Sequence, residues 1–290
     1  MEIITALSQV SGRYKALFVD LWGCVHDGYT PFPGAVEALT AYRDTGGVVI
    51  LVTNSPRPRA GVTTQLEEIG VPPGAYDDIA TSGDSARVAM YRGTVGANVW
   101  HLGPDHDAGF FSPPKVLDDP VAITRVSLDA ADGVVCTGPF DPLADPDTLR
   151  PELLAAKTRG LKLLCANPDI VVDRGDQREW CAGAIAKLYT EMGGESLYFG
   201  KPHPPIYDLA RRRLAQIADV GDADILAIGD GPQTDAAGAM GEDLDLLFIS
   251  GGLGASETGT PPQGNPDPDK LATYLAETGV VPTFTIGSLR

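Results

Sequence analysis

Two short apolar runs, each ending in polar residues, constrain the fold of this chain most strongly. Residues 16–20 read ALFVD, and residues 48–54 read VVILVTN. A continuous apolar run of this length is typical of a strand buried on both faces of a parallel sheet. Residues 34–45 and 59–70 follow the two runs with helical periodicity, and glycines stand where these helices should end. This alternation predicts an α/β fold in which helices cover a parallel sheet.

The middle of the chain has a second, less regular set of elements. Strands are predicted at residues 97–103, 133–139 and 161–169, and helices at residues 146–160 and 178–194. The first pattern then resumes, with strands predicted at residues 196–201, 224–230 and 244–250 and helices between them. We therefore predict an inserted α/β domain, residues 84–195, within a core domain formed by residues 1–83 and 196–290.

The charge of the chain argues against polyanionic partners. There are 39 Asp and Glu residues against 22 Lys and Arg, a formal net charge of −17. Nucleic acids and anionic membranes attract clustered cations, so we expect neither as a partner. A small anionic substrate stays compatible, because a bound metal ion can reverse the local field. Residues 1–15 contain no apolar run of signal-peptide length and no segment approaches transmembrane length, which favours a cytoplasmic location.

The four cysteines do not predict a zinc site. Cys24, Cys136, Cys165 and Cys181 include no CxxC pair. Three of them lie in apolar stretches, as buried structural thiols do. Cys24 lies close to Asp20, but no base near it in the sequence indicates an activated thiol.

Polar residues follow four of the predicted strands. They are Asp20, Thr53 with Asn54, Lys201 and Asp230. Ligands of open parallel sheets bind outside the carboxyl ends of the strands, so these side chains can converge. Phosphoryl transfer needs such a set: an anionic nucleophile, a divalent cation to reduce charge repulsion, and a lysine with hydrogen-bond donors for the phosphoryl oxygens.

Four segments in chain order resemble the four motifs of the haloacid dehalogenase superfamily: DLWGCVHDG, LVTNS, GKP and IGDGPQTD. The insert lies between the second and third of them, as in class IIA, the branch that resembles nucleotide and sugar-phosphate phosphatases. TSGDSA, CANPD and CAGAIAKLY resemble sequences of the class IIA cap. The resemblance implies a Rossmann-like core with an inserted α/β cap domain. It also implies a Mg²⁺-dependent hydrolase of a small phosphorylated metabolite, and class IIA caps make a homodimer plausible.

The resemblance further implies roles for the acidic motif residues. Asp20 would attack the phosphorus and form an aspartyl-phosphate intermediate. Asp20, the backbone carbonyl of Trp22 and the side chain of Asp230 would bind Mg²⁺, with waters completing an octahedron. Asp235 would bind the metal or orient those waters.

The substrate-binding residues come from the other motifs and from the cap. Thr53 and the backbone of Asn54 would hydrogen-bond the phosphoryl oxygens. Lys201 would pair with the phosphoryl group and keep Asp20 ionised. Asn167 and Asp169, in an NPD turn of the cap, would lie near the substrate.

Trp22 departs from the family pattern. Phosphatases of the family carry an aspartate here, which protonates the leaving alcohol and then deprotonates the attacking water. Tryptophan can do neither, although its backbone carbonyl can still bind a metal ion, and losing a general acid/base costs about 10²–10⁴-fold in rate. His26 is chemically suited to supply the proton, but the interpretation we favour is a turn histidine that faces solvent. Asp27 with Gly28 is a common turn pair.

Two alternatives to an ordinary phosphatase follow. The chain could be a phosphoryl-ligand binding or regulatory protein with weakened catalysis. It could instead cleave another bond, as phosphonatase-like relatives do with an imine-forming lysine. Lys157, Lys162 and Lys187 lie in the insert, and nothing in the sequence singles one of them out.

Overall fold

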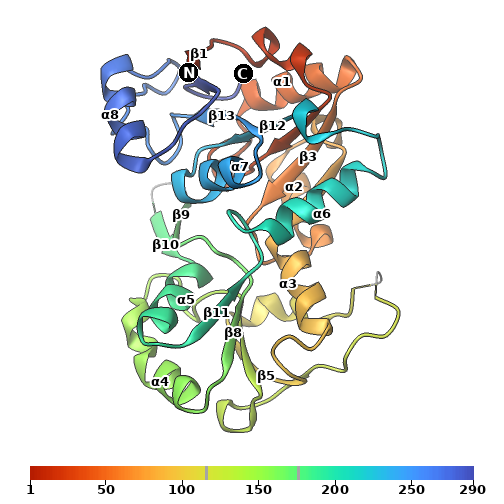
Figure 1. Ribbon diagram of the computed structural model, residues 1–290, viewed down its shortest axis with the longest axis vertical. Coiled ribbons are helices and arrows are strands. Elements are labelled where there is room, and N and C mark those ends of the chain that lie inside the picture. Colours follow the sequence, from red (N-terminus) through yellow and green to blue (C-terminus); the bar gives the residue numbers. More distant parts are fainter. Residues whose placement is uncertain (115–116, 175–176) are drawn as a thin grey trace. The chain divides into compact units, whose positions relative to one another are not determined.

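The computed structural model describes residues 1–114, 117–174 and 177–290, and these divide into two compact units (Figure 1). The first unit comprises Met1–Thr53, Thr63–Ala80 and Tyr207–Arg290. The second comprises Asn54–Val62 and Thr81–Ile206.

A seven-stranded sheet forms the centre of the first unit. Its order is β1 (Glu2–Ile3), β14 (Phe284–Ile286), β13 (Asp245–Ile249), β12 (Ile225–Gly229), β2 (Ala16–Val19), β3 (Val48–Thr53) and β4 (Asp78–Thr81). The pairs from β1 through β3 are all parallel. Every residue of β2 and β3 is buried, which explains why their sequences are continuously apolar.

Helices that fall wholly or mostly within the first unit accompany this sheet. They are α1 (Pro33–Asp44), α2 (Arg59–Ile69), α6 (Pro204–Leu214), α7 (Ala237–Gly241) and α8 (Pro268–Thr278). Local sequence sets their ends. Proline occupies the first turn of α1. The Asp267 carboxylate accepts the first free N–H groups of α8, and Gly279 ends that helix in the left-handed conformation, φ 72°.

The second unit has its own parallel sheet. The order is β11 (Glu195–Tyr198), β8 (Lys162–Cys165), β7 (Gly133–Cys136), β5 (Asn98–Leu102) and β6 (Thr124–Arg125). β9 (Val171–Arg174) and β10 (Gln177–Trp180) form an antiparallel pair, and the helices are α3 (Ser82–Tyr91), α4 (Arg150–Thr158) and α5 (Ala182–Glu191). Alternate residues of the sheet enter two apolar clusters: Val134 packs with residues of α4 and α5, and Val135 packs with residues of α3.

The predicted α/β class with a parallel-sheet core is confirmed, but two elements differ from prediction. The strand predicted at residues 196–201 exists as β11, yet it pairs with β8 in the second sheet and not with the core strands. The helix predicted from residue 178 begins at Ala182, because Gln177–Trp180 is strand β10. Ion pairs Arg178–Asp173 (2.7 Å) and Arg174–Glu179 (3.0 Å) join β10 to β9. The domain boundaries at residues 84 and 195 stay a prediction.

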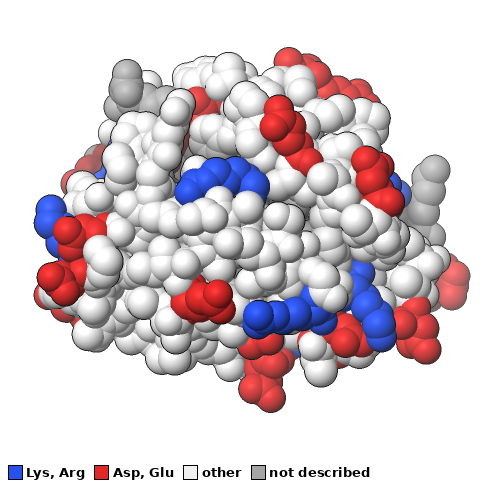
Figure 2. Space-filling model, turned by 90° about the horizontal axis from the view of Figure 1, so that it is seen from above, with Lys and Arg blue, Asp and Glu red and all other residues white. Residues whose placement is uncertain are grey.

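Charged side chains of both signs lie on the face shown in Figure 2. Among the described residues of that face, Lys and Arg side chains stand beside Asp and Glu side chains and form no continuous basic area. None of the helices in the described ranges has both the length and the apolar character needed to cross a lipid bilayer.

Candidate active site

Asp20 and Asp230 stand at the carboxyl ends of neighbouring parallel strands. Asp20 follows β2 and Asp230 follows β12, and the register places Val19 beside Ile228. The backbone N–H of Asp20 donates to the Ile228 carbonyl (2.9 Å), which extends the pairing by one residue to Asp20. Both acids are buried, with 8% and 4% of their surface exposed. The fold thus brings two carboxylates from opposite ends of the chain to one edge of the sheet.

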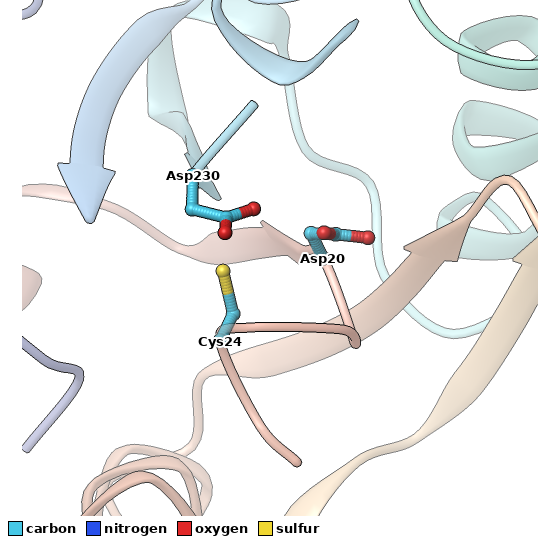
Figure 3. A group of neighbouring side chains, drawn as sticks. All are labelled: Asp20, Cys24 and Asp230. Atoms are coloured by element: carbon cyan, nitrogen blue, oxygen red, sulfur yellow. The ribbon is translucent and has the colours of Figure 1, made fainter. Parts of the chain in front are cut away.

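The thiol of Cys24 lies beside these two carboxylates. One ligand atom from each of Asp20, Cys24 and Asp230 lies within 4.8 Å of the other two (Figure 3). The N–H groups of Cys24 and Val25 donate to the Leu21 carbonyl (3.4 and 2.8 Å), which turns the chain back directly after the strand. Cys24 is therefore buried at the site, 1% exposed. Sequence reasoning found no role for it, and the available signal was its position in the loop that follows Asp20.

Close backbone contact fixes the Asp230 carboxylate. Gly23 has a φ of 77°, and a Cβ at this position would lie 2.4 Å from Asp230 Oδ2. A Cβ at Gly252 would lie 2.0 Å from the same oxygen. The backbone N–H of Leu253 donates to Oδ2 (2.8 Å). Only residues without a side chain can line Asp230 on these two sides.

The three ligand atoms fit a divalent cation. Two oxygens that bind one Mg²⁺ at about 2.1 Å are at most about 4.2 Å apart, so small side-chain rotations suffice to bring these atoms onto one ion. A divalent ion would also place positive charge beside two buried carboxylates, which favours their ionised form. Oxygen ligands suit Mg²⁺, whereas the sulfur is a softer donor that suits thiophilic metals. The backbone carbonyl of Trp22 stays a predicted ligand.

Asp235 is not a member of this ligand group. Its Oδ2 accepts the Gly231 backbone N–H (3.1 Å), and a Cβ at Gly229 would lie 2.2 Å from its Cγ. The carboxylate is thereby anchored on the turn after β12, 6% exposed. Its predicted role in orienting metal-bound water is compatible with this anchoring and stays a prediction.

Trp22 packs onto the turn that follows it. Its ring lies edge-to-face on the His26 ring, with centroids 5.1 Å apart and an interplanar angle of 71°. A Cβ at Gly28 would lie 2.5 Å from Trp22 Cζ2. His26 is 2% exposed, so the interpretation of a solvent-facing turn histidine is wrong.

Asn54 organises the Lys201 segment within the second unit. The backbone N–H of Lys201 donates to Asn54 Oδ1 (2.7 Å), and Asn54 Nδ2 donates to the Lys201 carbonyl (3.2 Å) and to Asp169 Oδ1 (2.8 Å). Lys201 is 3% exposed and Asn54 2%. Gly200 permits this approach, since a Cβ there would lie 2.4 Å from Asn54 Oδ1. The sequence analysis assigned a function to the backbone of Asn54 and missed the hydrogen bonds that its side chain makes with Lys201 and Asp169.

The NPD turn brings Asn167 and Asp169 into the same network. Asn167 Oδ1 accepts the Asp169 backbone N–H (3.0 Å), so that side chain stabilises the turn. The Cys165 thiol donates to the Asn167 carbonyl (3.2 Å), and burial raises the pKa of Cys165 to about 12. That thiol is structural. Thr53, the last residue of β3, is buried in the first unit.

The family models agree with this geometry. A model described as haloacid dehalogenase-like hydrolase matches residues 17–112, and a HAD-hydrolase-like model matches residues 198–278. The crystal structure of a haloacid dehalogenase-like hydrolase from Brucella suis 1330 is 39% identical, covers 99% of this chain and 100% of its own, and has a TM-score of 0.85. This chain belongs to the haloacid dehalogenase superfamily.

Two solved structures of lower sequence identity share the fold. A possible sugar phosphatase from Cytophaga hutchinsonii is 21% identical, with 99% of this chain and 98% of that one covered and a TM-score of 0.78. A glycerol phosphate phosphatase from Mycobacterium tuberculosis, in complex with magnesium, is 24% identical, with 88% and 74% covered and a TM-score of 0.64. The comparison with curated proteins gave no match.

Proposed function

We propose that this protein is a cytoplasmic, Mg²⁺-dependent phosphatase-type hydrolase that cleaves a small phosphorylated metabolite through an aspartyl-phosphate at Asp20. The observation that carries the proposal is the ligand group of Asp20 and Asp230 at adjacent strand ends. Superfamily membership supports it. A possible sugar phosphatase and a magnesium-bound glycerol phosphate phosphatase among the structural neighbours agree with the substrate class and the metal.

Asp20 is the proposed nucleophile. One of its oxygens would attack the phosphorus. Its other oxygen, the Asp230 carboxylate and the Trp22 carbonyl would hold Mg²⁺, and Asp235 would orient water. Bound Mg²⁺ would neutralise phosphoryl charge and orient the group for attack. Burial of Asp20 suits this role, because a water-excluded carboxylate is not masked by hydration.

Lys201, Thr53 and Asn54 would bind the phosphoryl oxygens. Two hydrogen bonds hold the backbone of Lys201: its N–H donates to Asn54 Oδ1, and its carbonyl accepts from Asn54 Nδ2. Such anchoring limits the positions that the ammonium group can take, which is what electrostatic preorganisation requires. Asn167 and Asp169 would contact the rest of the substrate.

Trapping of the covalent intermediate tests the proposal. Wild type and Asp20→Asn are incubated with Mg²⁺ and an aryl phosphate, quenched in acid, and analysed by peptide mass spectrometry for phosphate on Asp20. We expect product release and a phosphorylated Asp20 peptide in the wild type, with both absent in Asp20→Asn. Absence of both in the wild type would reject the hydrolase.

A phosphoryl-ligand binding protein with weakened catalysis is the second candidate, and Trp22 favours it. In that case wild type would bind inorganic phosphate in the presence of Mg²⁺ without turnover of any phosphate compound. The phosphonatase-like alternative gains no support, because Lys157, Lys162 and Lys187 are all exposed, and Lys162 is paired with Glu195 (2.8 Å).

A further inference from the structure

The loop from Leu21 to Phe32, which follows Asp20, carries Trp22 at the position where phosphatases of the family carry an acid. Trp22 lies two residues after Asp20, and its indole N–H is a hydrogen-bond donor that is not acidic enough to give up its proton. The acidic or basic side chains of the loop are those of Cys24, His26, Asp27 and Tyr29. In the structure, His26 and Asp27 accept backbone N–H groups of the turn, and Cys24 lies beside the two carboxylates.

The side chain of His26 is engaged in the turn that follows Asp20. Its Nδ1 accepts the Gly28 backbone N–H (3.0 Å). The edge-to-face contact with Trp22 and the 2% exposure of the ring leave little room to rotate away.

Asp27 is held as a carboxylate. Its Oδ1 accepts the backbone N–H groups of Tyr29 (2.9 Å) and Thr30 (2.8 Å). An oxygen that accepts two backbone N–H groups caps a turn and gives up no proton. Tyr29 itself is 59% exposed. Cys24 lies with the two carboxylates of the ligand group.

We infer, on the basis of the proposed function, that the substrates are phosphoryl compounds whose leaving group departs as a stabilised anion without a proton. Acyl phosphates, which release a carboxylate, and aryl phosphates, which release a phenolate, have this chemistry; alkyl phosphates do not. Asp20 forms the new bond to phosphorus, and the electron pair of the broken P–O bond leaves with the carboxylate or phenolate oxygen. Water then attacks the aspartyl-phosphate, releasing Asp20 and inorganic phosphate, and its proton passes to the phosphate or to solvent.

The second step, hydrolysis of the aspartyl-phosphate, has no aspartate at position 22 to act as its base. The inference therefore predicts a characteristic time course of product release. Formation of the aspartyl-phosphate from a good leaving group is fast, whereas its hydrolysis is slow. Pre-steady-state product release from an aryl phosphate should therefore show a burst of about one equivalent per active site, followed by a slower steady rate.

The test uses the wild type, Trp22→Asp and, as its matched control, Trp22→Asn, because asparagine has the shape of aspartate without its acidic group. For wild type, log kcat/KM in a series of aryl and alkyl phosphates should fall steeply as the leaving-group pKa rises, and acetyl phosphate should be cleaved. Trp22→Asp should raise turnover of alkyl phosphates by about 10²–10⁴-fold and flatten this dependence, and Trp22→Asn should not. The wild-type slope and burst decide the question even if neither variant folds.

The outcomes separate this inference from the proposed function. A flat wild-type dependence with alkyl phosphates cleaved as fast as aryl phosphates, or equal gains in the Asp and Asn variants, overturns the leaving-group inference and leaves the phosphatase intact. Absence of both turnover and labelled Asp20 with every aryl and acyl phosphate overturns the proposed function, and the inference with it.

Discussion

Substitution of Gly23 by alanine should weaken metal binding by displacing Asp230. The added Cβ would lie 2.4 Å from Asp230 Oδ2, where ordinary contact begins at 3.4 Å, so the carboxylate must move by about 1 Å. Metal–ligand distances hold to within about 0.2 Å. We expect divalent-metal affinity to fall by about 10–100-fold, as when a metal ligand loses its correct placement. The left-handed backbone at Gly23 adds a stability cost of about 1–2 kcal/mol.

Two matched variants separate displacement from backbone strain. Gly279→Ala carries the strain alone, since φ is 72° and nothing lies within 4 Å of its Cβ position. Gly252→Ala carries a contact with Asp230 Oδ2 at 2.0 Å without a left-handed φ. Gly23→Ala combines both features. Loss of metal affinity should follow Gly23→Ala and Gly252→Ala, and loss of stability without loss of metal affinity should follow Gly279→Ala.

The assay is titration with Mn²⁺ in place of Mg²⁺, with free Mn²⁺ measured by electron paramagnetic resonance. Urea denaturation without metal gives the free energy of unfolding of each variant. Wild-type Mn²⁺ affinity in folded Gly23→Ala and Gly252→Ala would refute the reasoning, because Asp230 would then be free to move or would not bind the ion.

Three further predictions concern single side chains. The hydrogen bond from the Thr30 backbone N–H is the main cause that lowers the pKa of Asp27 below its ordinary 3.8. This carboxylate therefore stabilises the fold fully above about pH 4, and the contribution is lost as pH falls through the lowered pKa. Urea denaturation from neutral to acid pH should therefore show a steeper loss for wild type than for Asp27→Asn, and parallel curves would contradict this. Asn54→Ala should cost about 1–3 kcal/mol, because the buried Lys201 N–H loses its acceptor, and an unchanged urea midpoint would argue against the network. Cys24→Val should weaken Cd²⁺ binding far more than Mg²⁺ binding in calorimetric titrations, because only the softer ion gains from sulfur; equal effects on both ions would exclude the thiol as a ligand.

The strands of the core and the acids that follow them were predictable from sequence, because both signals are local. A run such as ALFV can be buried on both faces only inside a sheet, and a carboxylate directly after it must lie at the strand end. Asp20 and Asp230 were identified in this way. Trp22 was also visible as a departure from the pattern without any structure.

Pairing and packing decided what local signals leave open. The sequence of β11 suits either sheet, and only its pairing with β8 places it in the second. Residues 177–180 can continue a helix or form a strand, and cross-strand ion pairs with β9 accompany the strand. The position of Cys24 beside two carboxylates, and the bonds that commit His26 and Asp27 to a turn, depend on how the chain folds back after Asp20. Distances between side chains are set by the whole fold, whereas the sequence pattern records only which face or strand end each side chain occupies.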